Sequence, residues 1–345
     1  MPFFATAQAH PNIALVKYWG KRDEALILPH QSSLSITLAP LEVTTTVRFG
    51  TSAGDEVELN GNVALGQERT RVLELVTAVR SEAAKQTGTT LGPVAVVSRG
   101  NFPASAGLAS SAAGFAALAV AARAAAGLAP DVVKASKLAR QGSGSACRSI
   151  QGGACVWWKG TRADGEDSFA EQLFPETHWP ELRLVVAVLS RAEKAVKSRD
   201  GMRNAVETSP YYPAWALDAE KEIARARAFI ANRDLEPLGA LCERNAWRMH
   251  ATSLAADPPL CYLLPSTLDL IQRVAEERAR GLPVWFTLDA GPNPVLLTDA
   301  AHAAQVEELA RTAGATQVIC CIPGGDAKVL PSAHGVPVPS ASGRA

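Results

Sequence analysis

The chain has 345 residues, 47% of them hydrophobic, which is enough to bury the core of one large domain or of two ordinary ones. Its 34 lysines and arginines balance 34 aspartates and glutamates, so the composition gives no reason to expect a nucleic-acid or membrane partner. Six cysteines without a CxxC spacing predict free thiols, and the N-terminus lacks the pattern of a signal peptide, so we expect a cytoplasmic protein.

Hydrophobic periodicity and turn residues predict a mixture of strands and helices in the first half of the chain. The β-branched run at 43–49 is the clearest strand. We expect further strands at 94–98 and 154–159, and helices at 67–86, 109–126 and 130–141. The polar stretch 160–180 is predicted to be a boundary or an exposed excursion.

The second half is predicted to be richer in helix, with strands at 182–189, 283–288, 295–298 and 317–322 and helices at 213–231, 234–253, 265–280 and 299–313. Strands and helices mix without strict βαβ alternation, which favours an α+β fold over a doubly wound sheet. We place an N-terminal domain at 1–180 and a C-terminal domain at 181–330. The tail at 331–345 is rich in Pro, Ser and Gly, and we expect it to be disordered.

The stretch from Asn101 to Gly114 (NFPASAGLASSAAG) is the most informative segment. Small residues let backbone N–H groups approach a ligand closely, and the helix that follows presents the positive end of its dipole. This combination predicts an anion site, most often for phosphate. The uncharged run from Ala104 to Ala122 also suits a membrane span, but Ala, Gly and Ser bury little apolar area, so we favour a buried helix. A purely structural Ala/Gly helix is the alternative.

A second loop runs from Arg140 to Ser149 (RQGSGSACRS). Serines flanked by glycines and followed by an arginine can surround an anion with hydroxyls, backbone N–H groups and a bidentate guanidinium. The alternative is a flexible loop with a solvated arginine.

Two lysines and an aspartate add to these loops. Lys17 and Lys21 lie in an otherwise apolar and aromatic segment, where a lysine needs an anionic partner if it is buried. The alternative is a pair of surface lysines at a strand edge. Asp289 ends an apolar strand and enters a tight turn, where it can act as a base or orient a hydroxyl. Its alternative role is to cap the turn with its own side chain.

Two anion-binding loops, additional lysines and a well-held aspartate together predict two phosphorylated ligands, which is what phosphoryl transfer requires. The segment Pro103-x3-Gly107-Leu108-x-Ser110-Ser111-Ala112-Ala113 resembles the phosphate-binding signature of the GHMP kinase superfamily. Within it, ordered motifs over about residues 7–325 resemble the diphosphomevalonate decarboxylase family: NIALVKYWGKRD at 12–23, GSGSACR at 142–148, GM and ETS within 201–209, and DAGPN at 289–293.

This resemblance implies a two-domain α+β fold of the GHMP kinase type, with a ribosomal protein S5 domain 2-like N-terminal domain and the active site between the domains. The family uses ATP and Mg²⁺ to phosphorylate the C3 hydroxyl of mevalonate 5-diphosphate, and phosphate then leaves with CO₂ to give isopentenyl diphosphate. By motif match, Asp289 would be the catalytic carboxylate at that hydroxyl. Arg148 would hold the substrate carboxylate, and Lys17 would lie beside the reacting centre.

The motif match also implies two sets of binding residues. The substrate would contact Tyr18, Trp19, Gly20, Lys21, Arg69, Ser143, Gly144, Ser145, Ala146, Cys147, Arg148, Ser198 and Arg199. The ATP phosphates would contact Ser105, Ala106, Gly107, Leu108, Ala109, Ser110 and Ser111, with Ser110 also near the metal. Among the first set, Lys21, Arg69 and Arg199 would be the basic residues that bind the diphosphate.

Other readings of the same motifs stay open. Phosphomevalonate decarboxylase and mevalonate 3-kinase are relatives with a different substrate or end point, although Lys17, Arg148 and Asp289 together favour a full decarboxylase. A sensor that kept the fold and lost catalysis is the alternative from another class, and the presence of Asp289 argues against it. Family members are commonly homodimers, so the resemblance also implies a homodimer that acts on a small molecule.

Overall fold

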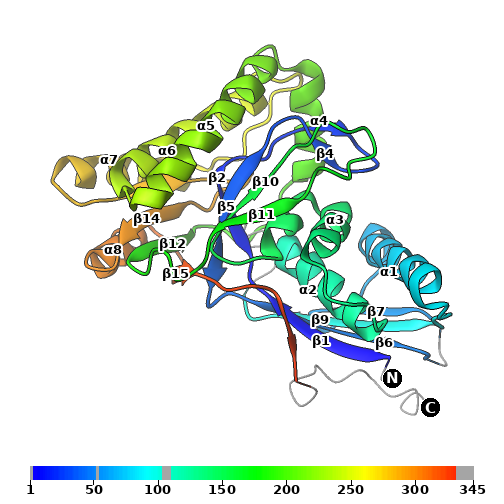
Figure 1. The fold of residues 1–345 in the computed structure, drawn as a ribbon. Helices are drawn as coiled ribbons and strands as arrows, with labels where there is room; N and C mark the ends of the chain where they lie inside the picture. The colour runs from blue at the N-terminus through cyan, green and yellow to red at the C-terminus, as the bar shows by residue number, and fades with distance from the viewer. Residues whose placement is uncertain (1–2, 52–53, 103–109, 332–345) are drawn as a thin grey trace.

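The computed structural model describes residues 3–51, 54–102 and 110–331. The predicted phosphate-loop residues Ser105 to Ala109 lie outside these ranges, as does the tail from residue 332 that we expected to be disordered. The described chain forms two large β-sheets with α-helices packed on both of them (Figure 1).

The six-stranded sheet joins the beginning of the chain to its last described strand. Its order is β16 (Lys328–Leu330), β1 (Phe4–Ala9), β6 (Val43–Phe49), β9 (Val94–Gly100), β7 (Glu56–Leu59) and β8 (Asn62–Val63). Three helices pack over it (Figure 1): α1 (Gly66–Thr87), α2 (Ser110–Ala125) and α3 (Val132–Gly142). The buried face of α2 is mostly alanine, so its backbone comes close to β1 and β6 and its first turn is held against the sheet.

The eight-stranded sheet combines strands from both halves of the chain. Its order is β11 (Ala170–Phe174), β10 (Ala154–Trp157), β5 (Ser33–Ala39), β15 (Gln317–Pro323), β12 (Leu182–Val188), β14 (Val295–Asp299) and β13 (Trp285–Thr287), and β2 (Asn12–Val16) also pairs with β5. All of these pairings are antiparallel. Because β5 pairs with both β10 and β15, it ties the N-terminal part of the sheet to the C-terminal part.

Four helices cover the C-terminal part of this sheet: α5 (Tyr212–Asn232), α6 (Leu235–Leu254), α7 (Pro265–Ala279) and α8 (Ala303–Thr312). Helix α6 packs on β13 and β2, the strands that precede the predicted catalytic residues Asp289 and Lys17. Three shorter elements complete the described chain: the hairpin of β3 (Lys21–Asp23) and β4 (Leu28–Pro29), the 3₁₀ turn η1 (Gly144–Ser149), and α4 (Ser198–Thr208). Within the described ranges, no helix combines the length and the apolar character that a membrane crossing requires.

The predicted α+β class is confirmed, and so are most of the predicted elements. The strand at 43–49 is β6, and the helices at 67–86 and 213–231 are α1 and α5 with ends shifted by one residue. The helix predicted at 299–313 begins only at Ala303, because the carboxylate of Asp299 accepts a hydrogen bond from the backbone N–H of His302. The polar stretch at 160–180 contains the edge strand β11, whose outward side chains hide the strand pattern. Helix α4 was not predicted at all.

Candidate active site

The centre of the candidate site is an ion pair between two segments that are far apart in the sequence. Lys17 follows β2, and its Nζ lies 2.6 Å from Oδ1 of Asp289, just beyond β13, and 2.7 Å from the carbonyl of Ala14. The lysine side chain is 2% exposed and the aspartate side chain 30% exposed. Burial lowers the pKa of Lys17, and the Asp289 carboxylate partly opposes this shift. The pair therefore presents a solvent-accessible carboxylate with a buried ammonium behind it.

The turn that carries Asp289 is fixed to β2 from a second direction. Thr287, the last residue of β13, donates its hydroxyl hydrogen to the carbonyl of Ala14 at 3.0 Å, which is the same carbonyl that accepts from Lys17. The turn is closed by the backbone N–H of Gly291, which donates to the carbonyl of Asp289 at 2.7 Å. These contacts hold the carboxylate in one place before any ligand binds.

Arg148 lies in η1 as a buried guanidinium that is 2% exposed. Its hydrogen bonds to described residues all go to neutral oxygens: Ser33 Oγ at 2.6 Å, Ser35 Oγ at 2.9 Å and Asn12 Oδ1 at 3.3 Å. Burial lowers its pKa, and the negative charge of Asp289 partly opposes that shift. A buried positive charge held only by neutral groups favours an anionic ligand, and a carboxylate matches the guanidinium fork.

The two predicted anion loops meet in the structure. The hydroxyl of Ser111, in the first turn of α2, lies 3.3 Å from the hydroxyl of Ser143, the residue that ends α3. Gly144 packs so closely under Tyr18 that a Cβ atom there would lie 2.8 Å from its ring. The same ring packs against Trp157 in a tilted arrangement, with a centroid distance of 4.7 Å and an interplanar angle of 58°. The glycine in this loop is therefore required by the close approach of an aromatic side chain.

Several basic side chains lie close enough together to affect one another's pKa values. Lys21, in β3, is 8% exposed and pairs with Glu24 at 2.5 Å. Its pKa is lowered, mainly by burial, and Arg199 and Arg203 of α4 lower it further. Burial and the charge of Arg199 also lower the pKa of Arg71 to about 10. We call Lys21, Arg71, Arg199 and Arg203 the basic cluster. Its mutual repulsion would be relieved by a polyanion such as a diphosphate.

Both halves of the chain are similar to known proteins. A model of the diphosphomevalonate decarboxylase-like N-terminal domain matches residues 9–170, and a model of the mevalonate 5-diphosphate decarboxylase C-terminal domain matches residues 184–320. Human diphosphomevalonate decarboxylase is 41% identical over 308 residues, covering 85% of this chain and 76% of the human one. The chain belongs to the diphosphomevalonate decarboxylase family.

Solved structures of the family have the same fold. The crystal structure of mevalonate diphosphate decarboxylase from Staphylococcus aureus superposes with a TM-score of 0.89 at 36% identity, covering 96% of this chain and 99% of that one. A structure described as MDDEF in complex with MVAPP, AMPPCP and magnesium gives a TM-score of 0.87 at 38% identity, covering 95% of this chain and 99% of that one. The two-domain α+β fold of the GHMP kinase type is thereby confirmed.

The remaining residues predicted from the family motifs lie after β2, within η1 and at the start of α4. Trp19 and Gly20 are buried, and Gly20 has a φ of 103° and packs against the hydroxyl of Tyr212. Within η1, the backbone carbonyl of Ser145 accepts from Asn12, and Ala146 and Cys147 are fully buried. Burial raises the pKa of the Cys147 thiol to about 12. Among the residues after β12, Ser198 begins α4 and accepts a hydrogen bond from Lys194 at 3.0 Å.

Arg69, which the family motifs predict to contact the diphosphate, lies on α1. Its guanidinium donates to the carbonyl of Asp55, before β7, at 2.9 Å. Arg71 lies two residues further on, about 200° around the helix, and donates instead to the carbonyl of Gly142 at 2.9 Å. The structure thus brings Arg71 next to the loop that contains Ser143, and Arg69 stays a predicted contact of the diphosphate. Helical periodicity could have separated the two arginines, but only knowledge of which face of α1 meets α3 selects Arg71.

His250 of α6 is another residue that the sequence analysis missed. Its side chain is 2% exposed and its Nε2 has no hydrogen-bond partner among the described residues. Burial, reinforced by the charge of Lys17, lowers the pKa of His250 to about 4, although the nearby backbone of Leu288 and Asp289 and the charge of Asp289 oppose the shift. The imidazole is therefore neutral at pH 7 and packs behind the Asp289 turn. No local motif marks it, because it lies within an ordinary amphipathic helix.

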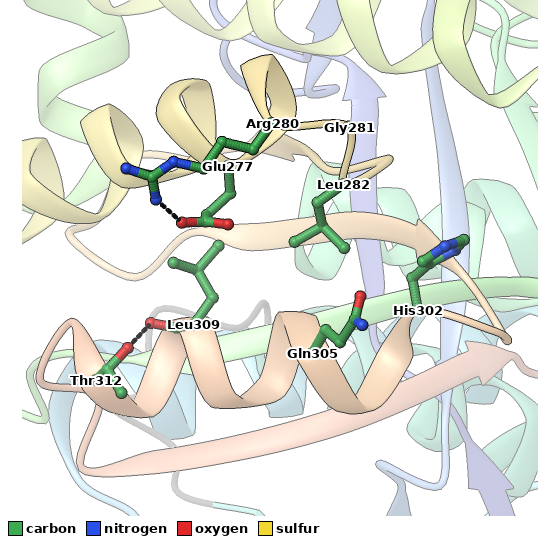
Figure 2. A pocket seen from close by; sticks show the side chains of 8 residues that line it. All are labelled: Glu277, Arg280, Gly281, Leu282, His302, Gln305, Leu309 and Thr312. Atoms are coloured by element: carbon green, nitrogen blue, oxygen red, sulfur yellow. Dashed lines mark hydrogen bonds and ion pairs between the residues drawn. The ribbon is translucent and has the colours of Figure 1, made fainter.

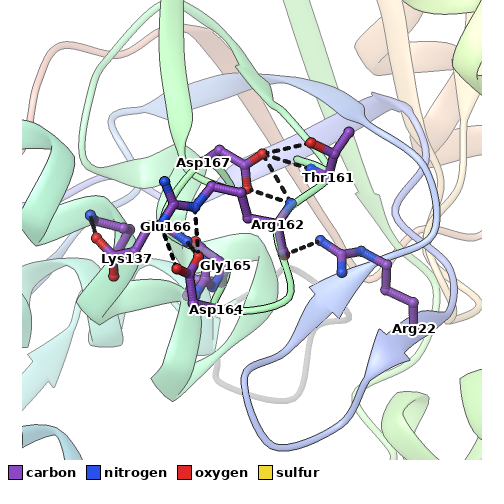
Figure 3. A network of polar contacts seen from close by, with 9 residues as sticks. Arg22, Lys137, Thr161, Arg162, Asp164, Gly165, Glu166 and Asp167 are labelled. Atoms are coloured by element: carbon purple, nitrogen blue, oxygen red, sulfur yellow. Dashed lines mark hydrogen bonds and ion pairs between the residues drawn. The ribbon is translucent and has the colours of Figure 1, made fainter.

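The loop between β10 and β11 borders the β3–β4 hairpin and is braced by its own charges (Figure 3). The carboxylate of Asp167 accepts hydrogen bonds from the backbone N–H groups of Thr161 and Arg162, and Arg162 pairs with Asp164 at 2.5 Å. Arg22 of β3 donates to the carbonyl of Arg162 at 3.2 Å. The acidic residues of this loop are thus used to fix its shape and the position of the neighbouring hairpin.

A cavity of about 490 Å³ lies apart from this site, between α7 and α8 (Figure 2). Its walls include Glu277 and Arg280, which pair with each other, and the apolar side chains of Leu282 and Leu309. It contains none of the residues that the family motifs predict. We therefore define the candidate active site by the buried and incompletely paired charges around Asp289.

The start of α2 is the part of the described chain that suits a metal and a nucleotide. Among the described residues, no three His, Cys, Asp or Glu side chains converge as they would in an all-protein metal cage. Mg²⁺ does not need such a cage, since it is commonly held by one or two protein oxygens, water and substrate phosphates. Ser110 supplies an oxygen at the start of α2, and the first turn of that helix has no acidic residue that would repel phosphate. This part of the site fits a magnesium-bound nucleotide.

Proposed function

We propose that the chain catalyses the ATP-dependent decarboxylation of (R)-5-diphosphomevalonate. The products are isopentenyl diphosphate, ADP, phosphate and CO₂, and the reaction proceeds through phosphorylation of the C3 hydroxyl. The observation that carries this proposal is the partly exposed carboxylate of Asp289, paired with buried Lys17 at 2.6 Å, beside an Arg148 guanidinium whose described partners are neutral. It supports the roles of a base, a cation and a carboxylate-binding group in one site.

The chemistry assigns a role to each of these three residues. Asp289 orients the C3 hydroxyl and accepts its proton as the phosphoryl group is transferred. Loss of phosphate from a tertiary carbon then develops positive charge at C3, which the same carboxylate stabilises. Lys17 keeps Asp289 in place and is a cation at the reacting centre. Arg148 holds the substrate carboxylate until the C–C bond breaks.

The rest of the substrate binds to the residues around these three. The basic cluster of Lys21, Arg71, Arg199 and Arg203, whose cations repel one another, would neutralise the 5-diphosphate together with Arg69. The serine and backbone N–H groups at 143–145 would bind its oxygens, with Tyr18 packed against the loop. This arrangement would keep the diphosphate distant from Asp289.

The nucleotide would bind at the start of α2. Ser110 and Ser111 with the helix N-terminus would hold the ATP phosphates, together with Ser105 to Ala109, which are not described in the structure. A bound Mg²⁺ would neutralise the charge of the ATP phosphates, and Ser110 is the residue proposed to hold it. The related protein solved with MVAPP, AMPPCP and magnesium supports these co-substrates.

A product assay tests the proposal directly. The purified protein is incubated with ATP, Mg²⁺ and, separately, mevalonate, its 5-phosphate and its 5-diphosphate, and the products are identified by mass spectrometry. We expect isopentenyl diphosphate from the diphosphate only, with one ADP and one CO₂ per turnover. A 3-phosphorylated product that keeps its carboxylate would instead indicate a kinase, and isopentenyl phosphate would indicate a monophosphate substrate.

Three further properties are part of the proposal. The matches of two family models to 9–170 and 184–320 support a division into domains at 1–180 and 181–330. Free thiols at all six cysteines support a reducing, cytoplasmic location. Membership of the family supports a homodimer, which light scattering coupled to size-exclusion chromatography would distinguish from the 36.3 kDa monomer.

A further inference from the structure

A buried carboxylate lies behind the site with no role in the chemistry above. Glu222 of α5 is 1% exposed, and its Oε2 accepts a hydrogen bond from Nδ2 of Asn245 at 2.6 Å. Its Oε1 accepts from Nε of Arg244 at 3.1 Å, and Arg248 lies at 3.6 Å. Burying a carboxylate is costly unless it is paired and hydrogen-bonded, so the structure uses three side chains of α6 to hold this one.

Asn245 links Glu222 to the candidate active site through two hydrogen bonds. The side chain is 1% exposed, and its Oδ1 accepts a hydrogen bond from the backbone N–H of Lys17 at 2.8 Å. Because Nδ2 is bound to Glu222, the amide is fixed with its oxygen toward β2. The backbone of Lys17 follows the last residue of β2, so a side chain takes the place of a strand partner at this position.

We infer that Asn245, oriented by Glu222, is a positioning residue for the Lys17–Asp289 pair. It fixes the backbone from which the Lys17 side chain starts. The ammonium is then directed to Asp289 at 2.6 Å and to the carbonyl of Ala14 at 2.7 Å. This inference rests on the proposed function of the same site and adds residues of α5 and α6 that no motif marks.

The geometry explains why the backbone of Lys17 has to be held in place. A lysine side chain has four rotatable bonds, and burying its ammonium requires that its acceptors be met within a few tenths of an ångström. The Asp289 turn is already tied to β2 through Thr287 and the Ala14 carbonyl. A displaced Lys17 backbone would separate the ammonium from the carboxylate without removing any group that contacts substrate.

Asn245→Ala is the first test, measured on the full-length enzyme with ATP, Mg²⁺ and mevalonate 5-diphosphate. Loss of the amide leaves the Lys17 N–H unpaired, and we expect kcat to fall about 10- to 100-fold while KM for the diphosphate changes less than about threefold. Thr252→Val is the matched control, because Thr252 is equally buried on α6 and its hydroxyl bonds only within the helix. A kcat of Asn245→Ala equal to that of this control overturns the inference.

Exchanging the hydrogen-bond partners separates positioning from simple destabilisation. Asn245→Asp keeps the acceptor for Lys17 but sets its second oxygen against Glu222, and we expect a loss of kcat of about tenfold. Adding Glu222→Gln restores the bond with donor and acceptor exchanged, and kcat should return to within about threefold of the wild type. A double variant no better than Asn245→Asp alone contradicts the proposed orientation.

A crystal structure of Asn245→Ala gives a readout that does not depend on turnover. We expect the Lys17 Nζ to Asp289 separation to exceed hydrogen-bonding distance, and an unchanged contact near 2.6 Å would overturn the inference. Failure of the wild-type enzyme to form isopentenyl diphosphate would instead refute the proposed function. The two ideas can therefore fail separately.

Discussion

Replacing Asp289 with asparagine removes one negative charge at the centre of the site and leaves the size of the side chain almost unchanged. Asp289 Oδ1 lies 2.6 Å from the Lys17 ammonium, whose other hydrogen bond is to a neutral carbonyl. The amide can neither accept the proton of the C3 hydroxyl nor stabilise positive charge at C3. It also leaves the lysine without an anionic partner.

The expected magnitude follows from these two losses. Removal of a general base typically costs about 10²- to 10⁴-fold in rate, which corresponds to about 3–5 kcal/mol of transition-state stabilisation. Removing one partner of a fully buried ion pair costs about 3–5 kcal/mol of folding stability, and because the Asp289 side chain is 30% exposed we expect about 1–3 kcal/mol here. The basic cluster is untouched, so KM for the diphosphate should change less than about threefold.

The stability of this variant also has a predictable pH dependence. Burial lowers the pKa of Lys17, and Asp289 opposes that shift, so Asp289→Asn lowers the pKa of Lys17 further. Between that lowered pKa and the ordinary lysine value, the unfolded state binds more protons, and stability rises with pH. The loss of folding stability of Asp289→Asn relative to the wild type should therefore be largest near neutral pH. It should shrink as the pH approaches 10.5, the ordinary pKa of lysine.

The assay measures CO₂ and ADP release at saturating substrate, with urea unfolding at two pH values. Asp299→Asn is the control, since Asp299 ends β14 and pairs with His302 away from the site. A kcat of Asp289→Asn within tenfold of wild type would refute the assignment of Asp289 as the base. A stability deficit that does not change with pH would refute the account of Lys17.

Three further predictions concern the surrounding residues. Arg199→Ala should raise KM for the diphosphate about tenfold and lower kcat less than about threefold, which steady-state kinetics will show. Arg71→Ala should raise the same KM more than Arg69→Ala does, because only Arg71 contacts the carbonyl of Gly142, and equal effects would contradict the placement of the basic cluster. Iodoacetamide at pH 8 should label exposed Cys261 and leave Cys147 unmodified, since burial raises the pKa of the Cys147 thiol to about 12, and peptide mass spectrometry measures both.

Local structure was largely predictable from the sequence because its causes are local. The β-branched run at 43–49 and the periodic segments at 67–86 and 213–231 fold as predicted, since side-chain period and backbone propensity act over a few residues. The small residues before α2 and the turn at Asp289 were also identified from residue type alone. Helix α4 was not predicted because its first turn is polar and few of its residues are buried, so the sequence there shows little helical periodicity.

The pairing of these local features was decided only by the tertiary structure. Lys17 and Asp289 are 272 positions apart, and their contact depends on β2, β5, α6 and β13 packing in one register. The choice of Arg71 over Arg69 depends on which face of α1 meets α3, and Asn245 has a role only because α6 crosses behind β2. Sequence determined which groups the site contains, because motifs fix chemistry over short spans. Tertiary packing determined which of them meet, because long-range register is set by the whole core and by no single segment.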